Sequence, residues 1–197
     1  LPGDKGYFIE VTRRMHPEIN KPVSWLSYEG KLRAHVTTTA HFVDGLKPGI
    51  TQVQVDHQNN VSRSDEEVEV VKQLVTDLAK RVAQKEILVV AAYNAQVDAI
   101  RIALQAAGYT DVMVGTVDKF QGREGLIVIY SFAASSAADA PRGLEFLLDR
   151  NRLNVAISRA KGHCYLVHST GLLKSRFRNV EELKCVSRLA GILEFTN

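Results

Sequence analysis

Apolar segments of two different periods alternate along this chain, and that alternation constrains the fold more than any other feature of the sequence. Residues 87–92 and 126–132 are almost continuously apolar, as expected for strands that are covered on both faces. Two amphipathic segments have apolar residues at helical spacing: one follows Ser64 and precedes the first of these strands, and one begins near Asn94 and lies between the two. Strands that alternate with helices favour a parallel sheet with right-handed crossovers, so we expect an α/β fold.

The same criteria predict the remaining elements. Further strands are expected at residues 51–57, 112–114 and 163–168, and further helices at residues 149–161 and after Asn179 as cap. Gly108 is expected to end the helix that begins near Asn94, because glycine readily adopts the left-handed conformation found at helix ends. Residues from about 33 to 50 show no clean period, so we expect an irregular excursion there, with room for one strand.

Another helix is expected near the start of the chain. Its apolar stripe consists of Ile19, Val23 and Leu26. Thr12 is expected to cap this helix, with Pro17 in the first turn, where proline is tolerated. The nearby aromatic residues Trp25 and Tyr28 are assigned to the core rather than to a base-stacking surface.

The length and charge of the chain narrow the range of functions. At 197 residues the chain is long enough to bury a sizeable core, and we expect residues 1–197 to form a single domain. A net charge of +3 permits an anionic partner without requiring one. Two cysteines give no disulfide framework, and no apolar run reaches the roughly 18 residues of a membrane span. These features indicate a cytoplasmic protein that does not enter a membrane.

Polar residues crowd the segment 114–124, which lies between two predicted strands. Parallel sheets of α/β proteins bind ligands at the carboxyl ends of their strands, so this segment is a candidate for chemistry. Two further clusters of unusual polar residues are found at 13–17 and 150–159.

The last of these clusters contains two arginines at a spacing that suggests a shared ligand. Arg152 and Arg159 are seven residues apart, which predicts that both project from one side of a helix. Paired guanidinium groups suit the oxygens of a phosphate chain, because each planar fork can donate two parallel hydrogen bonds.

Taken in order, the clusters resemble motifs IV, V and VI of superfamily 1 helicases, in the second RecA-like domain of the branch that contains the RNA-surveillance helicases. The matching segments are Arg-Met-His-Pro at 14–17 with Tyr-Glu-Gly-Lys-Leu at 28–32, Tyr-Asn-Ala-Gln-Val at 93–97, residues 115–124, and Arg-Leu-Asn-Val-Ala-Ile-Ser-Arg-Ala-Lys at 152–161. The segment 130–147 is similar to bacterial proteins in which a RecB-like nuclease is fused to such a helicase. The resemblance covers nearly the whole chain and implies a RecA-like fold, a parallel sheet flanked by helices.

The resemblance also implies how particular residues meet ATP and Mg²⁺. Arg14 and Arg159 would contact the γ-phosphate as arginine fingers, which in related NTPases accelerate phosphoryl transfer by roughly 10³- to 10⁵-fold. Gly122 and Glu124 would lie beside the nucleotide, with Glu124 accepting a hydrogen bond from ribose or orienting Arg159. Arg152 would contact phosphate or brace motif V.

One departure from the family pattern concerns motif IV. An aromatic residue usually precedes its arginine, and here that position is Arg13. Either Arg13 or Arg14 could therefore be the residue that reaches the phosphate.

The resemblance implies that a single strand of nucleic acid lies along other residues of motif V. Thr116 would contact a backbone phosphate, with Lys119 and Gln121 as neighbours. DNA is favoured over RNA because of the resemblance to nuclease fusions. The six histidines and two cysteines show no metal-ligand spacing, so no protein-held metal site is expected.

The chain lacks the phosphate-binding loop Gly-x-x-x-x-Gly-Lys-Ser/Thr. Its acidic run Asp65-Glu66-Glu67 follows Ser64 and opens a helix, so we interpret the run as part of a capping box rather than as a magnesium site. The resemblance then implies that ATP is held mainly by a preceding RecA-like domain. A RecB-like nuclease domain in the same polypeptide is a further candidate partner, and this fragment alone is expected to be an inactive ATPase.

Two other functions are compatible with parts of the sequence. The chain could be a non-catalytic RecA-like module that binds nucleic acid or protein, in which case arginine substitutions would leave its activity unchanged. A doubly wound enzyme unrelated to helicases would need its own glycine-rich phosphate loop, which the chain lacks. At single positions, Thr116 could be a strand-end hydroxyl, Glu124 a structural partner of Arg123 or Arg159, and His16 a local hydrogen-bonding group.

Overall fold

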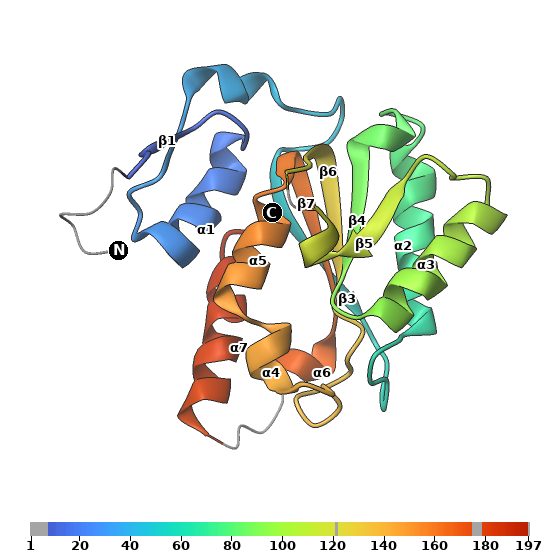
Figure 1. Ribbon diagram of the computed structural model, residues 1–197. Coiled ribbons are helices and arrows are strands. Elements are labelled where there is room, and N and C mark those ends of the chain that lie inside the picture. The colour runs from blue at the N-terminus through green and yellow to red at the C-terminus, as the bar shows by residue number, and fades with distance from the viewer. Residues whose placement is uncertain (1–7, 121, 175–178, 197) are drawn as a thin grey trace.

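The computed structural model describes residues 8–120, 122–174 and 179–196 of the chain. Its centre is a five-stranded parallel sheet in the order β3-β7-β6-β4-β5 (Figure 1). The strands are β3 (Gly49–Val55), β4 (Ile87–Ala91), β5 (Met113–Thr116), β6 (Gly125–Ser131) and β7 (Ala160–Ser169). The predicted parallel α/β sheet is confirmed, and each predicted strand is present with ends shifted by three residues or fewer.

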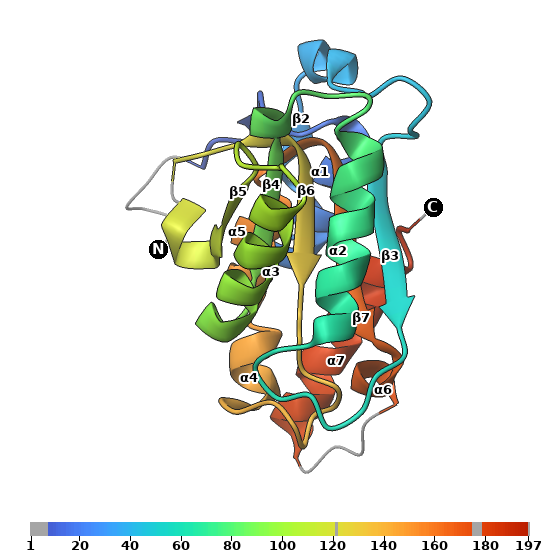
Figure 2. The same cartoon turned by 90° about the vertical axis from the view of Figure 1, so that its right-hand side faces the viewer.

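Helices cover both faces of the sheet, as the two views in Figures 1 and 2 show. One face carries α2 (Asp65–Leu78) and α3 (Asn94–Ala106). The other face carries α1 (Pro17–Tyr28), α4 (Gly143–Leu147), α5 (Arg150–Ile157), α6 (Thr170–Leu173) and α7 (Val180–Leu193). Short 3₁₀ helices occur at η1 (Val36–Ala40), η2 (Gln84–Glu86) and η3 (Val117–Phe120). Within the described part of the chain, no helix is long and apolar enough to cross a membrane.

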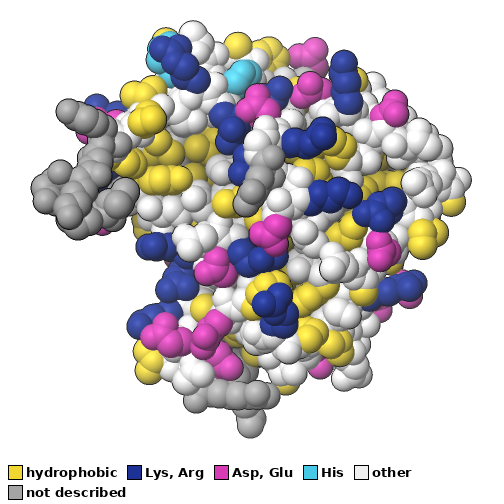
Figure 3. All heavy atoms as spheres, in the orientation of Figure 1, with side chains coloured by type: hydrophobic (Ala, Val, Ile, Leu, Met, Phe, Trp, Pro, Cys, Tyr) yellow, Lys and Arg dark blue, Asp and Glu magenta, His cyan; other side chains and the backbone are white. Residues whose placement is uncertain are grey.

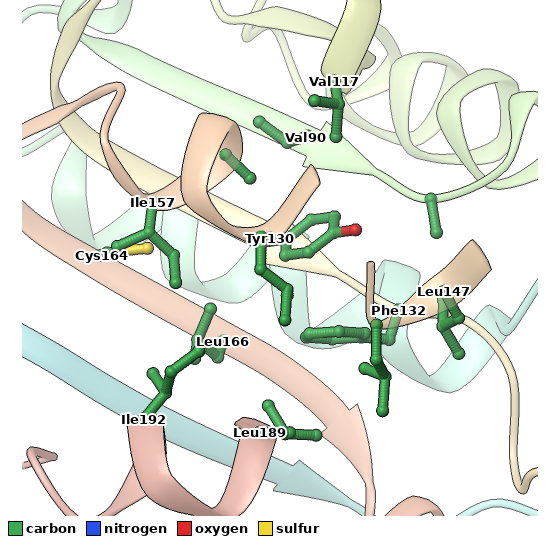
Figure 4. Packing of buried hydrophobic residues seen from close by; sticks show 14 of the residues in the cluster. Val90, Val117, Tyr130, Phe132, Leu147, Ile157, Cys164, Leu166, Leu189 and Ile192 are labelled. Atoms are coloured by element: carbon green, nitrogen blue, oxygen red, sulfur yellow. The ribbon is translucent and has the colours of Figure 1, made fainter. Parts of the chain in front are cut away.

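Two hydrophobic clusters, one on each face, hold the helices on the sheet. Successive strand residues alternate between the clusters: Val89 and Ile129 belong to the one with α2 and α3, whereas Val90 and Tyr130 belong to the other. Figure 4 shows the second cluster, in which Tyr130 lies among side chains from the sheet and the helices packed on it. Burial on both faces is the reason that these strands are continuously apolar in the sequence.

Side-chain caps define where two of the longest helices begin. Ser64 Oγ accepts a hydrogen bond from Glu67 N at 3.1 Å at the start of α2. Asn179 Oδ1 accepts from Glu182 N at 2.8 Å at the start of α7. Both predicted caps are confirmed, and the acidic run that follows Ser64 opens a helix as interpreted.

The first helix begins later than predicted. Its cap is His16 rather than Thr12, with His16 Nδ1 accepting from a backbone N–H of the first turn at 3.2 Å. Pro17 occupies the first turn as expected. Thr12 instead ends the short strand β1 (Val11–Thr12), whose pairing with β2 (Arg33–Ala34) keeps this backbone extended.

Trp25 is not a core residue, so this prediction was wrong. It is 48% exposed and lies over Gly191 of α7, with its ring 6.1 Å from the ring of Phe195. The apolar stripe of α1 faces the core, and at about 100° per residue Trp25 lies roughly 120° away from that stripe. Tyr28 is half-buried and packs against the edge of the core.

The helix predicted at residues 149–161 is shorter than expected. α5 has 8 residues, and the chain enters β7 at Ala160, which pairs with Gly125 at the start of β6. Gly162 lies against the backbone of His41, where an added Cβ would be 2.9 Å from the carbonyl oxygen. The partner strand and this close approach decide where the helix ends, and neither can be read from the local pattern.

The excursion predicted at about residues 33–50 is largely irregular. It contains β2, η1 and an antiparallel bridge between Val43 and Leu46. Its last residues already belong to β3, because the pairing of β3 with β7 begins at Gly49.

Buried His163 gives the fold a predicted pH dependence. Its Nδ1 donates to the Lys47 carbonyl at 2.8 Å, and burial lowers the pKa of His163 from 6.5 to about 4. Because the unfolded chain binds the proton more tightly, stability is fully present above pH 6.5 and decreases as the pH falls towards 4. The free energy of unfolding should fall by up to about 3 kcal/mol over that interval.

Urea denaturation at several pH values measures this effect, with His163→Gln as the comparison. The variant should show a flatter profile between pH 6.5 and 4 than the unmodified chain. Parallel profiles for the two proteins would contradict the assignment to His163.

Candidate functional site

The predicted site residues lie at two opposite edges of the sheet. The segment 114–124 leaves the carboxyl end of β5 at Thr116 and returns to the start of β6, with Arg123 Nη1 3.3 Å from Met113 Sδ at the beginning of β5. In Figure 2 the arrowheads of β3 and β6 point downward, so the amino edge is at the top and the carboxyl edge at the bottom. The first part of the segment therefore lies at the carboxyl ends of the strands, whereas residues 122–124 lie at the amino edge, a division that the sequence did not indicate.

At the amino edge, Arg14 is paired with Glu124. Arg14 Nε donates to Glu124 Oε2 at 2.7 Å, and Arg14 Nη1 donates to the Ser158 carbonyl at 3.3 Å. The backbone that carries Arg14 is held against the sheet because His16 N donates to the Lys161 carbonyl of β7 at 2.7 Å. Three segments distant in sequence therefore meet beside the first residues of β6 and β7.

The pairing identifies which of the two neighbouring arginines belongs to this cluster. The hydrogen bond from Arg14 is the main reason that the pKa of Glu124 lies below its usual value, with burial acting in the opposite direction. Arg13 is exposed. Arg14, rather than Arg13, is the arginine that contacts Glu124, and Glu124 pairs with Arg14 rather than with Arg123 or Arg159.

Arg159 is the second arginine of this cluster, and one of its donors is unused. Its Nη1 donates to the Arg123 carbonyl at 3.4 Å, while its Nε is buried without a hydrogen-bond partner among the described residues. Burial lowers the pKa of Arg159, nearby Arg14 lowers it further, and Glu124 opposes both. A buried N–H without an acceptor is unfavourable, so this guanidinium is suited to an anion that supplies one.

A cleft of about 680 Å³ opens beside this cluster. Its polar and charged lining consists of Thr12, Arg13, Arg14, Glu124 and Ser158, and Arg159 is not part of the lining. Its apolar lining consists of Phe8, Ile9, Val11, Met15, Tyr28 and Leu32. Gly122 lies just before Glu124, exposed and with φ +80°, a conformation that glycine adopts readily. The described residues that line the cleft include arginines, which can donate to phosphate, but they do not include a phosphate-binding loop.

At the carboxyl edge lie the residues predicted to contact a strand. Thr116 is the last residue of β5, in register with Ala91 of β4, and is partly exposed. Lys119 is exposed, and its aliphatic stem packs over Gly115, where an added Cβ would be 2.8 Å from Lys119 Cδ. Gln121 lies outside the described residues.

Arg152 belongs to the carboxyl edge rather than to the cluster of Arg14 and Arg159. Its Nη1 is 3.5 Å from Asp118 Oδ2 in η3, and its guanidinium carbon is 4.3 Å from the centroid of the Phe146 ring. Because α5 ends before position 159, the two motif VI arginines do not project from one side of a helix. That prediction was wrong, and the alternative that Arg152 braces motif V matches its contact with Asp118.

A buried polar network, not predicted from the sequence, lies behind the carboxyl edge. Its centre is Glu67, whose carboxylate accepts from Ser131 Oγ at 2.6 Å, Ala133 N at 3.0 Å and His57 Nε2 at 3.1 Å. Gln96 Nε2 donates in turn to Ser131 Oγ at 3.0 Å. The network joins the loops after β3 and β6 to the first turns of α2 and α3.

The position of Glu67 in the sequence carries a signal of its burial. Glu67 precedes Val71, Val75 and Leu78 at helical spacing, so it lies on the buried stripe of α2. A carboxylate on such a stripe must find buried donors, because an unpaired charge in the interior is strongly unfavourable. Its position within a capping box concealed this second role. Among the described residues, no group of three or more His, Cys, Asp or Glu side chains could hold a metal ion.

Comparisons with known proteins identify relatives of this chain. The model of the AAA domain family matches residues 3–170. The DNA replication ATP-dependent helicase/nuclease dna2 of Schizosaccharomyces pombe is 34% identical over 200 residues, covering 85% of this chain and 14% of that protein. Regulator of nonsense transcripts 1 of Caenorhabditis elegans is 30% identical over 195 residues, covering 88% of this chain and 18% of that protein. The chain thus spans less than a fifth of these relatives.

A solved structure is similar to the fold. The C-terminal domain of a possible DNA helicase from Lactobacillus plantarum WCFS1 superposes with a TM-score of 0.50 at 17% identity, covering 82% of this chain and 89% of that one. Together with the parallel sheet and its flanking helices, this similarity confirms the predicted RecA-like α/β fold.

The two glutamates of these sites should differ in their contribution to stability. Glu67→Gln places an amide where a buried carboxylate accepts from three donors, and we expect it to lower the free energy of unfolding by about 2 to 3 kcal/mol. Glu124→Gln weakens a pair whose side chains are 34% and 45% exposed, so a loss below about 1 kcal/mol is expected. Urea denaturation at pH 7 measures both, and equal losses would contradict this ranking.

Proposed function

This chain belongs to the AAA domain family, whose model matches residues 3–170, and on that basis we propose that it is the C-terminal motor domain of an ATP-dependent superfamily 1 helicase. Its curated relatives include proteins named as DNA helicases and one named as a regulator of nonsense transcripts. We infer that ATP lies against the amino edge of the sheet and a single strand of nucleic acid against the carboxyl edge.

The observation that carries this proposal is the unpaired Nε of Arg159. It lies buried near Arg14, and Arg14 itself lines the cleft of about 680 Å³. Two guanidinium groups repel each other, and one carboxylate, that of Glu124, neutralises only one of them. A phosphate group would supply both the missing acceptor and the missing negative charge, so these residues fit the polyphosphate of ATP.

Each residue at the amino edge would then have a distinct role. ATP supplies the phosphoryl group whose transfer to water releases free energy. Arg14 and Arg159 would donate to phosphate oxygens and stabilise the charge that develops during transfer. Glu124 would hold Arg14 in place beforehand, so that little reorganisation is needed when the nucleotide arrives. Gly122 would let the backbone approach the nucleotide closely.

ATP with Mg²⁺ would be held mainly by a preceding RecA-like domain, because this chain contains no phosphate-binding loop. The chain by itself would therefore not hydrolyse ATP. A RecB-like nuclease domain in the same polypeptide is proposed from the resemblance of residues 130–147 to nuclease–helicase fusions. One relative, named as a helicase/nuclease, agrees with that arrangement without requiring it.

At the carboxyl edge, Thr116, Lys119 and Gln121 would contact the backbone of the strand. Binding of this kind depends on phosphate charge, so we expect it to weaken with salt and to vary little with base sequence. We propose DNA as the preferred strand because of the nuclease resemblance, and ATP hydrolysis stimulated by DNA or by RNA compares the two directly.

Strand-stimulated ATP hydrolysis tests the motor assignment. The measurement uses this chain alone, its full-length polypeptide, and that polypeptide with Arg159→Ala or Arg14→Ala. The chain alone should show no strand-stimulated ATP hydrolysis. In the full-length polypeptide, each substitution should lower turnover by about 10³- to 10⁵-fold while ATP still binds.

Arg13→Ala is the matched comparison, because Arg13 is adjacent to Arg14 and does not pair with Glu124. Its turnover should stay near that of the unmodified polypeptide. A loss with Arg13→Ala and none with Arg14→Ala would assign the phosphate contact to Arg13. Full activity in Arg159→Ala would refute the motor assignment and favour a non-catalytic RecA-like binding module.

A further inference from the structure

Phe146 in α4 lies against two guanidinium groups that come from different parts of the chain. The guanidinium carbon of Arg142, the residue before α4, is 3.7 Å from the centroid of the Phe146 ring. That of Arg152, in α5, is 4.3 Å from the same centroid. Such distances are well within the range of cation–π attraction.

This cluster lies next to the predicted strand contacts. Arg152 reaches Asp118, two residues beyond Thr116, across 3.5 Å. The Phe146 ring is also 5.9 Å from the ring of Tyr93, which follows β4 at the carboxyl edge. Figure 3, drawn in the orientation of Figure 1, shows Lys and Arg side chains among hydrophobic ones over α4 and α5.

Stacking on an aromatic ring fixes a guanidinium without consuming its hydrogen-bond donors. The ring attracts the flat face of the cation, and the N–H groups point outward in the plane of the fork. Arg142 is exposed, and the 3.5 Å separation between Arg152 and Asp118 is long for a hydrogen bond between charged groups. Both cations therefore retain donors for a further anion.

Tyr93 supplies another polar atom without a partner. The residue is 8% exposed, and its hydroxyl is buried without a hydrogen-bond partner among the described residues. Burial raises the pKa of Tyr93 to about 12, while Arg142 and Arg152 act in the opposite direction. The hydroxyl thus remains protonated at neutral pH and adds a donor to a cluster that already carries two cations.

We propose that Phe146 holds Arg142 and Arg152 as one clamp for the phosphate backbone of a single strand, continuing the contact made at Thr116. This inference rests on the proposed function, because it assumes that the strand crosses the carboxyl edge. Phe146 is the positioning residue, and Arg142 is a contact residue to which the sequence resemblance gave no role. Phe146 itself is not a base-stacking surface, since guanidinium groups already occupy its ring.

The test measures strand binding without ATP, using the full-length polypeptide and a fluorescent thymidine oligonucleotide of about 20 nucleotides, long enough for a typical single-strand site. Fluorescence anisotropy gives the dissociation constant at several salt concentrations. Each phosphate contact contributes about 0.7 to the slope of log affinity against log salt for single strands. Arg142→Gln should therefore reduce the magnitude of that slope by about 0.7.

Variants of Phe146 separate positioning from packing. Phe146→Leu keeps both cations but removes the ring, and should weaken binding and reduce the slope. Phe146→Tyr keeps the ring and should restore both. If Phe146 acts through Arg142, the effects of Arg142→Gln and Phe146→Leu should not add in the double variant. Lys80→Gln removes one exposed positive charge just beyond the end of α2 and should leave the slope unchanged.

The inference fails if Arg142→Gln keeps the original slope, if Lys80→Gln lowers it equally, or if Phe146→Tyr does not restore binding. It also fails if Arg142→Gln weakens only the binding of a polyglutamate peptide, because the surface would then recognise acidic protein. Loss of strand-stimulated hydrolysis in Arg159→Ala is measured separately. If turnover depends on Arg159 but the salt slope does not change in Arg142→Gln, only the clamp is refuted. If the slope falls in Arg142→Gln but the polypeptide does not hydrolyse ATP, the clamp is supported and the motor assignment is refuted.

Discussion

The rest of the structure depends on the parallel pairing of β6 with β4 on one side and β7 on the other. All three strands are buried on both faces, so their backbone groups have no water to bond and must pair with one another. Because β6 and β7 are neighbours and run the same way, the residues that precede them come together at the amino edge. Gly125 N donates to the Arg159 carbonyl at 3.1 Å, which joins the two strand starts directly. Glu124 and Arg159 owe their proximity to this pairing, and Arg14 is added by the hydrogen bond between His16 and β7.

The same pairing separates the two proposed ligands by the length of the sheet. β6 has 7 residues, which corresponds to about 20 Å of extended chain. Residues 117–120 follow β5 at the carboxyl edge, and residues 122–124 lead into β6 at the amino edge, so motif V has one end at each edge of the sheet. In the proposed motor, closure of a nucleotide cleft at the amino edge would move Thr116 and Arg152 together, because the closely packed sheet connects the amino edge rigidly to the carboxyl edge. The strand contacts would then shift with the state of ATP without any change inside the domain.

At the carboxyl edge, the buried carboxylate of Glu67 holds the polar groups in place through hydrogen bonds. Glu67 gathers donors from the loops after β3 and β6, including the N–H of Ala133, which has φ +67°. A residue other than glycine adopts that conformation at a cost, which the hydrogen bond to Glu67 helps to offset. The loop that begins there leads to Arg142 and α4, and so connects the network to the cation cluster around Phe146.

Periodicity in the sequence by itself determined the strands, the caps at Ser64 and Asn179 and the parallel α/β class, because those depend on side chains close together in the chain. The resemblance of the motifs to those of superfamily 1 helicases also pointed to Arg14, Glu124 and Arg159 as residues of interest. It could not show that Arg152 stands apart from them, that Trp25 is exposed or that Glu67 is buried. Each of these depends on a partner distant in sequence: Asp118 for Arg152, α7 for Trp25, and the loop after β6 for Glu67. Local patterns specify which face of an element is buried. Only the tertiary structure decides what that face contacts, because contacts between remote segments set the order of the strands and the edge of the sheet at which each residue lies.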